Sequence, residues 1–407
     1  MRKLLAALAL AAPTLALAGD GVDTGDTALV LISAGLVLLM TPGLAFFYGG
    51  LVRAKNVVHT MILSIACMAI VGVLWPVIGY SLAFSPGPAG LDRFVGGLSW
   101  LGLAGVGVRP EPSLAATVPH SAFMLFQAMF AVITPALISG AIVERVRIKA
   151  FLLFVALWSV VVYTPVAHWV WAPGGWLHQL GALDFAGGTV VHINAAAAAL
   201  VAAALLGRRR GLRAPTVMPH NVPFAILGAG LLWFGWLGFN GGSALGANGL
   251  AATAFVNTVF APAAGFVSPM AGMALGALAS LASYSAVQVR PRLGLDDSLD
   301  VFAVHGVAAT LGALLTGLLA SRAVNPAGAD GSLALLGVQA IGVVATLAWS
   351  GVLSLVLLKL VALVTPLRAD EQDEWNGLDM SEAGERAYVS SDLEASPHAA
   401  RESATAA

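Results

Sequence analysis

Residues 184–206 read DFAGGTVVHINAAAAALVAAALL, and this stretch decides the class of fold. From residue 189 onward it contains no Asp, Glu, Lys or Arg. A helix of about 20 apolar residues crosses the hydrocarbon core of a bilayer, because the core is about 30 Å thick and each residue rises 1.5 Å. The continuous apolarity also differs from the alternating pattern of a barrel strand. We therefore interpret 189–206 as a membrane-spanning helix that carries one polar ring, His192.

Similar apolar stretches fill most of the chain. Hydrophobic residues make up 58% of the 407 residues and charged residues only 10%, and the mean hydropathy is +0.87. A soluble domain has about a quarter of its residues charged. The sequence thus predicts an all-α polytopic membrane protein with about 9–10 transmembrane segments. Besides 189–206, the candidate stretches are 27–51, 57–84, 120–142, 150–171, 221–242, 247–289, 300–320 and 333–363.

Charge and cysteine content exclude several other classes of protein. The formal net charge of -1 gives no general attraction to nucleic acid. Cys67, the single cysteine, lies in an apolar run, which excludes disulfides and cysteine metal sites. No nucleophile–base pair and no Gly-rich phosphate loop indicates an enzyme, and we predict no cofactor.

Both ends of the chain differ from the apolar middle. Residues 1–18 have a basic start, an apolar run and the small-residue site Ala16-Leu17-Ala18, which predicts a cleaved signal peptide. An uncleaved short first helix is the alternative. Residues 19–365 form the predicted transmembrane domain, and 366–407 form a polar C-terminal tail.

The basic residues of the loops predict the orientation. They occur in alternate loops, which the positive-inside rule places in the cytoplasm, with the mature N-terminus outside and the tail inside. The loops carry Arg53 and Lys55, then Arg145, Arg147 and Lys149, then Arg208, Arg209, Arg210 and Arg213. The loop near residue 244 lies outside, so Arg290 is on the cytoplasmic side only if residues 247–289 cross the membrane once. We predict one span at 267–289, after a re-entrant or tilted segment at 247–266.

Two pairs of segments indicate an internal repeat. Residues 43–50 (GLAFFYGG) resemble 235–242 (GWLGFNGG), and Val191-His192 resembles Val304-His305. The two helices that open the halves run in opposite directions, which is typical of inverted repeats with a substrate site between them. The predicted repeats are about 27–206 and 221–320, followed by a final helix at 333–363. Phe47 precedes His192 by 145 positions, whereas Phe239 precedes His305 by only 66, so the second half lacks a helical hairpin.

The polar residues inside spans are the candidates for function, because burying them in a membrane is costly. His192 and His305 occupy matched repeat positions. A pair of neutral imidazoles would give a narrow apolar pore a polar stripe; the alternatives are structural histidines bonded to carbonyls and metal ligands. No Cys, Asp or Glu stands at ligand spacing. Asp184 and Asp300 precede them by eight and five residues, near helix starts, and Asp184 is expected to cap its helix.

Aromatic residues gather near one end of several predicted helices. Phe126 and Phe130 are four residues apart and share a helix face. The others are Trp171, Trp236 and Phe239, with Ser243 one turn beyond Phe239. Such residues form either an interfacial aromatic belt or a cation site in which ring faces attract the charge. The residues alone leave both interpretations open.

Five motifs resemble one known family. They are 184–195 (DFAGGTVVHINA), 42–51 (PGLAFFYGGL), 140–145 (GAIVER), 235–243 (GWLGFNGGS) and 300–306 (DVFAVHG). Together they closely resemble the ammonium transporter (Amt/Mep/Rh) family, in particular its bacterial Amt branch. The similarity covers nearly the whole mature chain.

The resemblance implies eleven transmembrane helices, a homotrimer in the bacterial inner membrane, and one pore in each subunit. It places Phe126, Phe130, Trp171 and Ser243 in an outer ammonium recruitment site beside Asp184. It makes Phe130 and Phe239 the gate, and His192 and His305, with Trp236, the pore. Residues 377–379 and 384–388 resemble the cytoplasmic tail that works with a PII-type regulatory protein.

One departure from the family is large. Between 255–259 and Phe266 the chain lacks about three dozen residues, which correspond to the inner half of helix seven and most of helix eight. Their loss matches the short second half and keeps the later helices in the same orientation. Their loss is expected to change the trimer contacts and the closure of the inner half of the pore. The sequence therefore predicts an ammonium transporter or channel; the alternatives are an ammonium sensor that acts through a PII-type partner and an inactive truncated paralogue.

Overall fold

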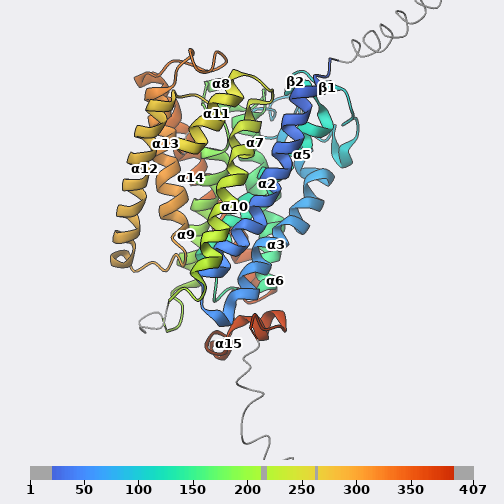
Figure 1. Cartoon of the computed structure of the whole chain (residues 1–407). Helices are drawn as coiled ribbons and strands as arrows, with labels where there is room; N and C mark the ends of the chain where they lie inside the picture. Colours follow the sequence, from blue (N-terminus) through green and yellow to red (C-terminus); the bar gives the residue numbers. More distant parts are fainter. Residues whose placement is uncertain (1–20, 212–217, 262–264, 389–407) are drawn as a thin grey trace, which may run out of the picture.

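The structure is a bundle of helices that run roughly parallel to one another (Figure 1). This computed structural model describes residues 21–211, 218–261 and 265–388. The predicted signal peptide, residues 1–18, and the end of the tail lie outside the described residues. One end of the bundle carries helix α15 (Glu371–Asn376) and the opposite end carries the strands β1 (Pro110–Glu111) and β2 (Ala115–Pro119). We call these the α15 end and the β end.

Within the described residues, nine helical segments are long and apolar enough to cross a membrane. This confirms the predicted all-α polytopic membrane fold. Several segments join an α-helix to a π-helix or a 3₁₀-helix. The segments are Thr24–Leu51 (α2), Ala54–Phe84 (with α3, Val57–Leu74, and α4, Tyr80–Phe84), His120–Ile142 (α5), Ile148–Leu180 (with α6, Ile148–Trp158, α7, Thr164–Trp171, and α8, Trp176–Leu180), Gly188–Leu206 (with α9, Asn194–Leu206), Val222–Ala244 (with α10, Val222–Gly241), Pro269–Leu293 (with α12, Pro269–Val289), Phe302–Leu319 (with α13, Ala308–Leu319) and Leu333–Val364 (α14).

Helix α11 (Gly249–Phe260) is too short to cross a membrane. Its 12 residues span about 18 Å, little more than half of the hydrocarbon core. It lies toward the β end, and α12 follows with Pro269 in its first turn and a Ser268 cap. The helix bounds agree with the prediction of a short apolar segment before one full span.

Glycines let α2 and α10 approach each other closely. A Cβ atom at Gly228 would lie 2.2 Å from the backbone nitrogen of Phe47, and one at Gly50 would lie 2.5 Å from that of Ala225. Small residues at such positions allow backbone-to-backbone packing of membrane helices. The contact fixes the position of α10, which carries Trp236 and Phe239.

A buried ionic cluster joins four segments at the α15 end. The Glu144 side chain is 1% exposed and accepts from Arg53 at 3.0 Å and from Arg209 at 3.1 Å. Arg209 also binds Asp296 at 2.9 Å, and Arg145 donates to the Asp296 carbonyl at 2.6 Å. The cluster therefore ties the loops after α5 and α9 to the segment that leads to His305.

The described part of the tail packs on the same end. The Asp379 carboxylate accepts from the backbone N–H of His59 at 2.8 Å, and Asn56 accepts from the N–H of Leu378 at 2.9 Å. Gly377 has φ +108, and a Cβ atom there would lie 2.5 Å from the Lys55 carbonyl. Glycine is thus required where the tail crosses the 3₁₀ turn between α2 and α3.

We expect Glu144→Gln to lower the free energy of unfolding in detergent by about 3 kcal/mol near neutral pH, because it removes a buried carboxylate charge that pairs with both Arg53 and Arg209. Burial acts to raise the pKa of Glu144, but the hydrogen bond from Arg53 and the charges of Arg209 and Arg53 hold that pKa below its usual 4.5. A carboxylate with a depressed folded pKa contributes stability above its unfolded pKa and loses it as the pH falls through the folded pKa.

The difference between wild type and Glu144→Gln is therefore expected to be constant above about pH 6 and to shrink below about pH 4.5. Denaturant unfolding at several pH values measures it. Glu371→Gln is the control, because this side chain is 62% exposed in its pair with Arg210 and such pairs contribute little. A difference that stays the same at every pH would contradict the assignment of the stability to this carboxylate.

Candidate functional site

Four aromatic rings from three helices meet near the β end of the bundle. On α5, Phe126 and Phe130 lie edge to face at 4.9 Å between ring centroids. Phe130 contacts Trp171 of α7 at 5.8 Å and Phe239 of α10 at 4.3 Å. Phe126 and Phe130 are 1% exposed and Phe239 is 2% exposed. The Phe130–Phe239 contact therefore closes the space between α5 and α10.

Ser243 and Asp184 lie beside the aromatic cluster but bond to backbone groups. The Ser243 hydroxyl donates to the Phe239 carbonyl at 2.8 Å. The indole N–H of Trp171 donates to the Asp184 carbonyl at 2.9 Å. Gly242, which precedes Ser243, lies close to the aromatic rings: a Cβ atom at Gly242 would be 2.8 Å from Cε2 of Phe126. The structure thus brings the predicted recruitment residues into one region.

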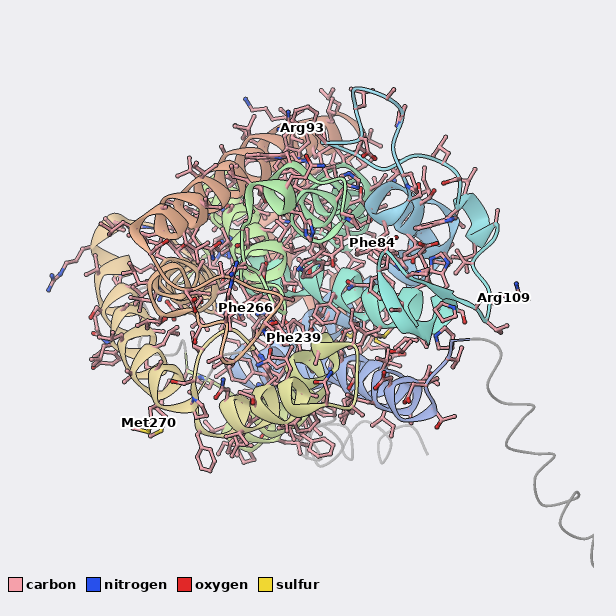
Figure 2. The ribbon with its side chains drawn as sticks, turned by 90° about the horizontal axis from the view of Figure 1, so that it is seen from above. Phe84, Arg93, Arg109, Phe239, Phe266 and Met270 are labelled. Atoms are coloured by element: carbon pink, nitrogen blue, oxygen red, sulfur yellow. The ribbon has the colours of Figure 1, made fainter. Side chains whose placement is uncertain are left out.

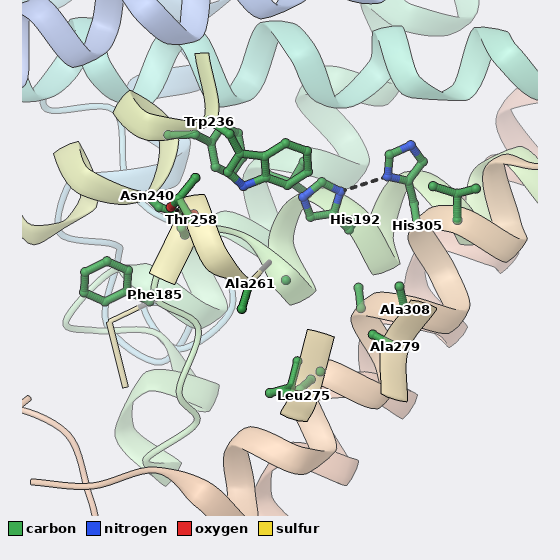
Figure 3. A pocket seen from close by; sticks show the side chains of 18 of the residues that line it. Phe185, His192, Trp236, Asn240, Thr258, Ala261, Leu275, Ala279, His305 and Ala308 are labelled. Carbon is green, nitrogen blue, oxygen red and sulfur yellow. Dashed lines mark hydrogen bonds between the residues drawn. The ribbon is translucent and has the colours of Figure 1, made fainter. Parts of the chain in front are cut away.

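His192 and His305 form a hydrogen-bonded pair, shown by the dashed line in Figure 3. Their Nδ1 atoms are 3.1 Å apart, and their rings are parallel within 6° at 5.2 Å. Trp236 stacks on His192 with ring centroids 5.5 Å apart, and the ring centroid of Phe239 lies 6.1 Å from that of His192. Because a neutral imidazole donates with one nitrogen and accepts with the other, one ring carries its proton on Nδ1 and the other does not.

Each histidine lies on a π-helix, Gly188–Ile193 for His192 and Phe302–Val307 for His305. Short π-helical turns are frequent at functional sites. Asp184 caps the first of them, because its carboxylate accepts from the N–H groups of Gly187, Gly188, Thr189 and Val190 at 2.6, 2.8, 2.8 and 3.0 Å. This cap fixes the backbone that positions the His192 ring.

Asp297, which the sequence reasoning missed, has the corresponding place before His305. Its carboxylate accepts from the N–H groups of Val301 and Phe302 at 3.0 and 2.7 Å. Asp300, which the sequence analysis noted near the start of this helix, instead pairs with Arg290 at 2.7 Å and has φ 59. The signal was present in the sequence, since Asp297 precedes His305 by eight residues, as Asp184 precedes His192.

A cavity of about 740 Å³ extends from the histidine pair toward α12 (Figure 3). His192 and His305 line it, together with Trp236, Leu275, Ala279 and Ala308. Among the described residues, no group of three His, Cys, Asp or Glu side chains converges to hold a metal ion. The ring nitrogens of the two histidines can donate and accept hydrogen bonds.

Comparison with known families decides the family of this chain. The model of the Ammonium Transporter Family matches residues 28–267 and 260–388. The chain belongs to this family. The result confirms the resemblance seen in the sequence, and it makes the protein a member of a family of transporters rather than an enzyme.

This ammonium transporter family member has similar relatives of known name and structure. It is 45% identical over 408 residues to an ammonium transporter of Bacillus subtilis, covering 90% of this chain and 99% of the relative. The crystal structure of Candida albicans Mep2 superposes with a TM-score of 0.80 at 32% identity, covering 92% of this chain and 93% of that one. A structure described as a sensor Amt protein gives a TM-score of 0.80 at 26% identity, covering 88% and 98%.

The same comparisons bear on the missing residues of this family member. Ninety per cent of 407 residues is about 366, so about 42 of the 408 positions aligned with the Bacillus relative have no residue in this chain. The two matches to the family model meet at residues 260–267. Helix α11 ends there, at Phe260. The short helix and the cavity beside it thus lie where the chain departs from the family pattern.

Proposed function

We propose that this chain conducts ammonia across the membrane after recruiting ammonium at the aromatic cluster of Phe126, Phe130 and Trp171, with Ser243 beside it. A ring face attracts a small cation by about 0.5–2 kcal/mol, and a hydroxyl oxygen accepts an N–H bond. The contacts of Phe130 with Phe126 and Trp171 support this site. Asp184 serves it indirectly, since its carbonyl holds the Trp171 indole.

The gate separates ammonium from potassium by chemistry rather than by size. Moving an ion into an apolar interior costs several kcal/mol, on the order of the effective desolvation penalties in proteins. Ammonium avoids that cost by releasing its proton, whereas potassium has none to release. Neutral ammonia then passes Phe130 and Phe239 and reaches His192. The proton either stays outside or crosses separately through the histidine pair.

The observation that carries the proposal is the histidine pair directly beyond the gate. His192 lies 6.1 Å, between ring centroids, from the gate ring of Phe239 and also hydrogen-bonds His305. Neutral, mutually bonded imidazoles offer polar atoms to ammonia without a fixed charge. Structural histidines that only hold the backbone would bond to carbonyls, as His168 does to the Ala83 carbonyl at 2.9 Å.

We propose the bacterial inner membrane as the location, with the α15 end in the cytoplasm and the N-terminus outside after signal cleavage. The basic residues of the α15 end support this orientation. We further propose a homotrimer, as the family resemblance implies, and a PII-type protein bound to the tail. Trp375 and Tyr388 of the tail are 55% and 47% exposed, which leaves them accessible to such a partner.

Flux into proteoliposomes tests the proposal. The purified chain is expected to take up methylammonium faster than empty liposomes and to exclude potassium. A sensor would bind ammonium and a PII-type protein but would move neither ion. An inactive paralogue would show no binding. The sensor remains the second candidate because one structural relative at 26% identity is described as a sensor.

Trp171→Leu is expected to raise the KM for methylammonium about 2- to 30-fold with little change in the maximal rate, because it removes one ring from the cation site. Uptake measured over a range of substrate concentrations gives both values. Trp176→Leu is the matched control, since this ring contacts Trp169 outside the cluster. An unchanged KM in Trp171→Leu would rule this ring out of recruitment.

A further inference from the structure

The cavity beside the histidine pair is bounded on one side by helices that do not pack together. Helix α12 packs on α11 and α13, but among the described residues it has no comparable packing with α10. The short helix α11 fills the gap only toward the β end. Viewed along the bundle, Phe239 lies inward while Met270, at the start of α12, lies at the periphery (Figure 2). The gap between α10 and α12 is therefore open in the part of the bundle that α11 does not reach.

Apolar side chains line this gap. Trp233 and Trp236 face it from α10, Leu275 and Ala279 from α12, and Val304 from the segment of His305. Trp233 is 56% exposed and Val304 is 48% exposed. Toward the β end, Phe185 and Phe266 meet edge to face at 5.6 Å and narrow the cavity. Where no second copy covers it, this surface contacts the hydrocarbon chains of a bilayer rather than water.

Two arginines without carboxylate partners lie beyond the gap at the α15 end. Arg209 and Arg210 bind Asp296 and Glu371, whereas Arg208 and Arg292 form no ion pair among the described residues. Arg208 donates to the Gly294 carbonyl at 2.9 Å, which places it beside the turn that follows α12. Arg292 is exposed in that turn. Basic side chains at this level of a membrane protein bind anionic lipid headgroups.

We propose that the cavity is a phospholipid site. One acyl chain enters between α10 and α12 and lies against Trp236 and the His192–His305 pair, and the anionic headgroup binds Arg208 and Arg292. The lipid replaces the missing protein wall of the pore. The proposal stands apart from the proposed function, because lipid binding is measured without any flux.

The size and lining of the cavity favour a lipid chain over other occupants. Its volume of about 740 Å³ is in the range of pockets for small ligands, about 300–1,000 Å³. A helix from a second copy, about 10 Å wide and 30 Å long, is much larger. Water is disfavoured because a largely apolar cavity offers few of the two to four polar partners that a buried water needs.

Tryptophan quenching by brominated lipids tests the site in the full-length chain. The protein is reconstituted with phosphatidylglycerol that carries bromine in mid-chain, among unlabelled zwitterionic lipids. The emission of each ring is obtained by subtracting the spectrum of its Trp→Phe variant. We expect loss of Trp236 emission comparable to that of Trp233, and no loss for Trp158, which is fully buried on α6. Trp236 emission as insensitive to bromine as that of Trp158 would overturn the proposal.

Two variants check the path and the headgroup. Ser280→Phe narrows the gap from α12 and is expected to restore Trp236 emission, whereas Ala277→Phe, exposed on α12 outside the cavity lining, is not. The double variant R208Q/R292Q is expected to reduce the quenching of Trp236 to the level given by the fraction of brominated lipid in the bilayer, because anionic lipid is no longer preferred at the site. Unchanged quenching there would refute the headgroup site. Quenching of Trp236 by aqueous iodide instead of brominated lipid would show a water-filled cavity, and protection from both would show a second copy.

Discussion

Replacing His192 and His305 together by alanine is expected to reduce selective methylammonium uptake at least about tenfold, which corresponds to ~1.4 kcal/mol in the barrier. The double variant removes the 3.1 Å Nδ1–Nδ1 bond and every polar atom that the pair offers to ammonia. Ammonia that has lost its water shell would then cross an apolar region without a hydrogen-bond partner, which raises its free energy. Initial rates in proteoliposomes measure the effect.

The control variant must alter the lining of the same cavity and leave both histidines unchanged. Thr316→Ala does so, because Thr316 lines the cavity and its hydroxyl bonds the Gly312 carbonyl of its own helix. This variant is expected to keep the wild-type rate. Wild-type uptake by the double histidine variant would remove both rings from the proposed mechanism. Thermal unfolding of both variants in detergent separates a loss of transport from a loss of fold.

Asp184→Ala is expected to destabilise the fold by about 3–5 kcal/mol, because four partly buried backbone N–H groups lose the carboxylate that accepts their hydrogen bonds. The orphaned groups belong to the π-helix that carries His192, so the ring also loses its fixed position. Denaturant unfolding measures the first effect, and flux per folded molecule measures the second.

Asp297→Ala is the matched comparison, since its carboxylate accepts from two such N–H groups rather than four. It is expected to cost about half as much stability as Asp184→Ala, given a similar contribution from each charged hydrogen bond. Asp184→Asn keeps one acceptor oxygen and is expected to fall between wild type and the alanine variant. Equal stability of Asp184→Ala and wild type would show that water satisfies these N–H groups and that the cap is dispensable.

The spans and the histidine pair were predictable from the sequence, because both depend on local chemistry. Long apolar runs need no tertiary information to be recognised as membrane helices, and a histidine within one is conspicuous. The short segment at 247–266 followed from charge counting, since Arg290 had to return to the side of Arg209. Even the missing hairpin was visible, as the unequal spacing from Phe47 and Phe239 to the two histidines.

Other features depend on packing that a single sequence does not display. The choice of Asp297 over Asp300 as the cap rests on which carboxylate reaches the backbone N–H groups, and three residues of spacing do not decide that. The π-helical turns leave no residue pattern of their own. The Glu144 cluster joins four segments far apart in the chain. The cavity depends on how α11, α12 and α13 pack when a hairpin is absent, and the sequence alone does not show that packing.

The bond between the two Nδ1 atoms gives the histidine pair a direction. At any moment one ring donates and its partner accepts, so the pair holds one proton in one of two equivalent arrangements. A proton that hops through the pair exchanges these roles. The next proton cannot follow the same way until both rings turn over or trade tautomers. Under the proposed function, ammonia would require no such turnaround, so the pair would limit the pace of proton transfer without slowing the neutral molecule.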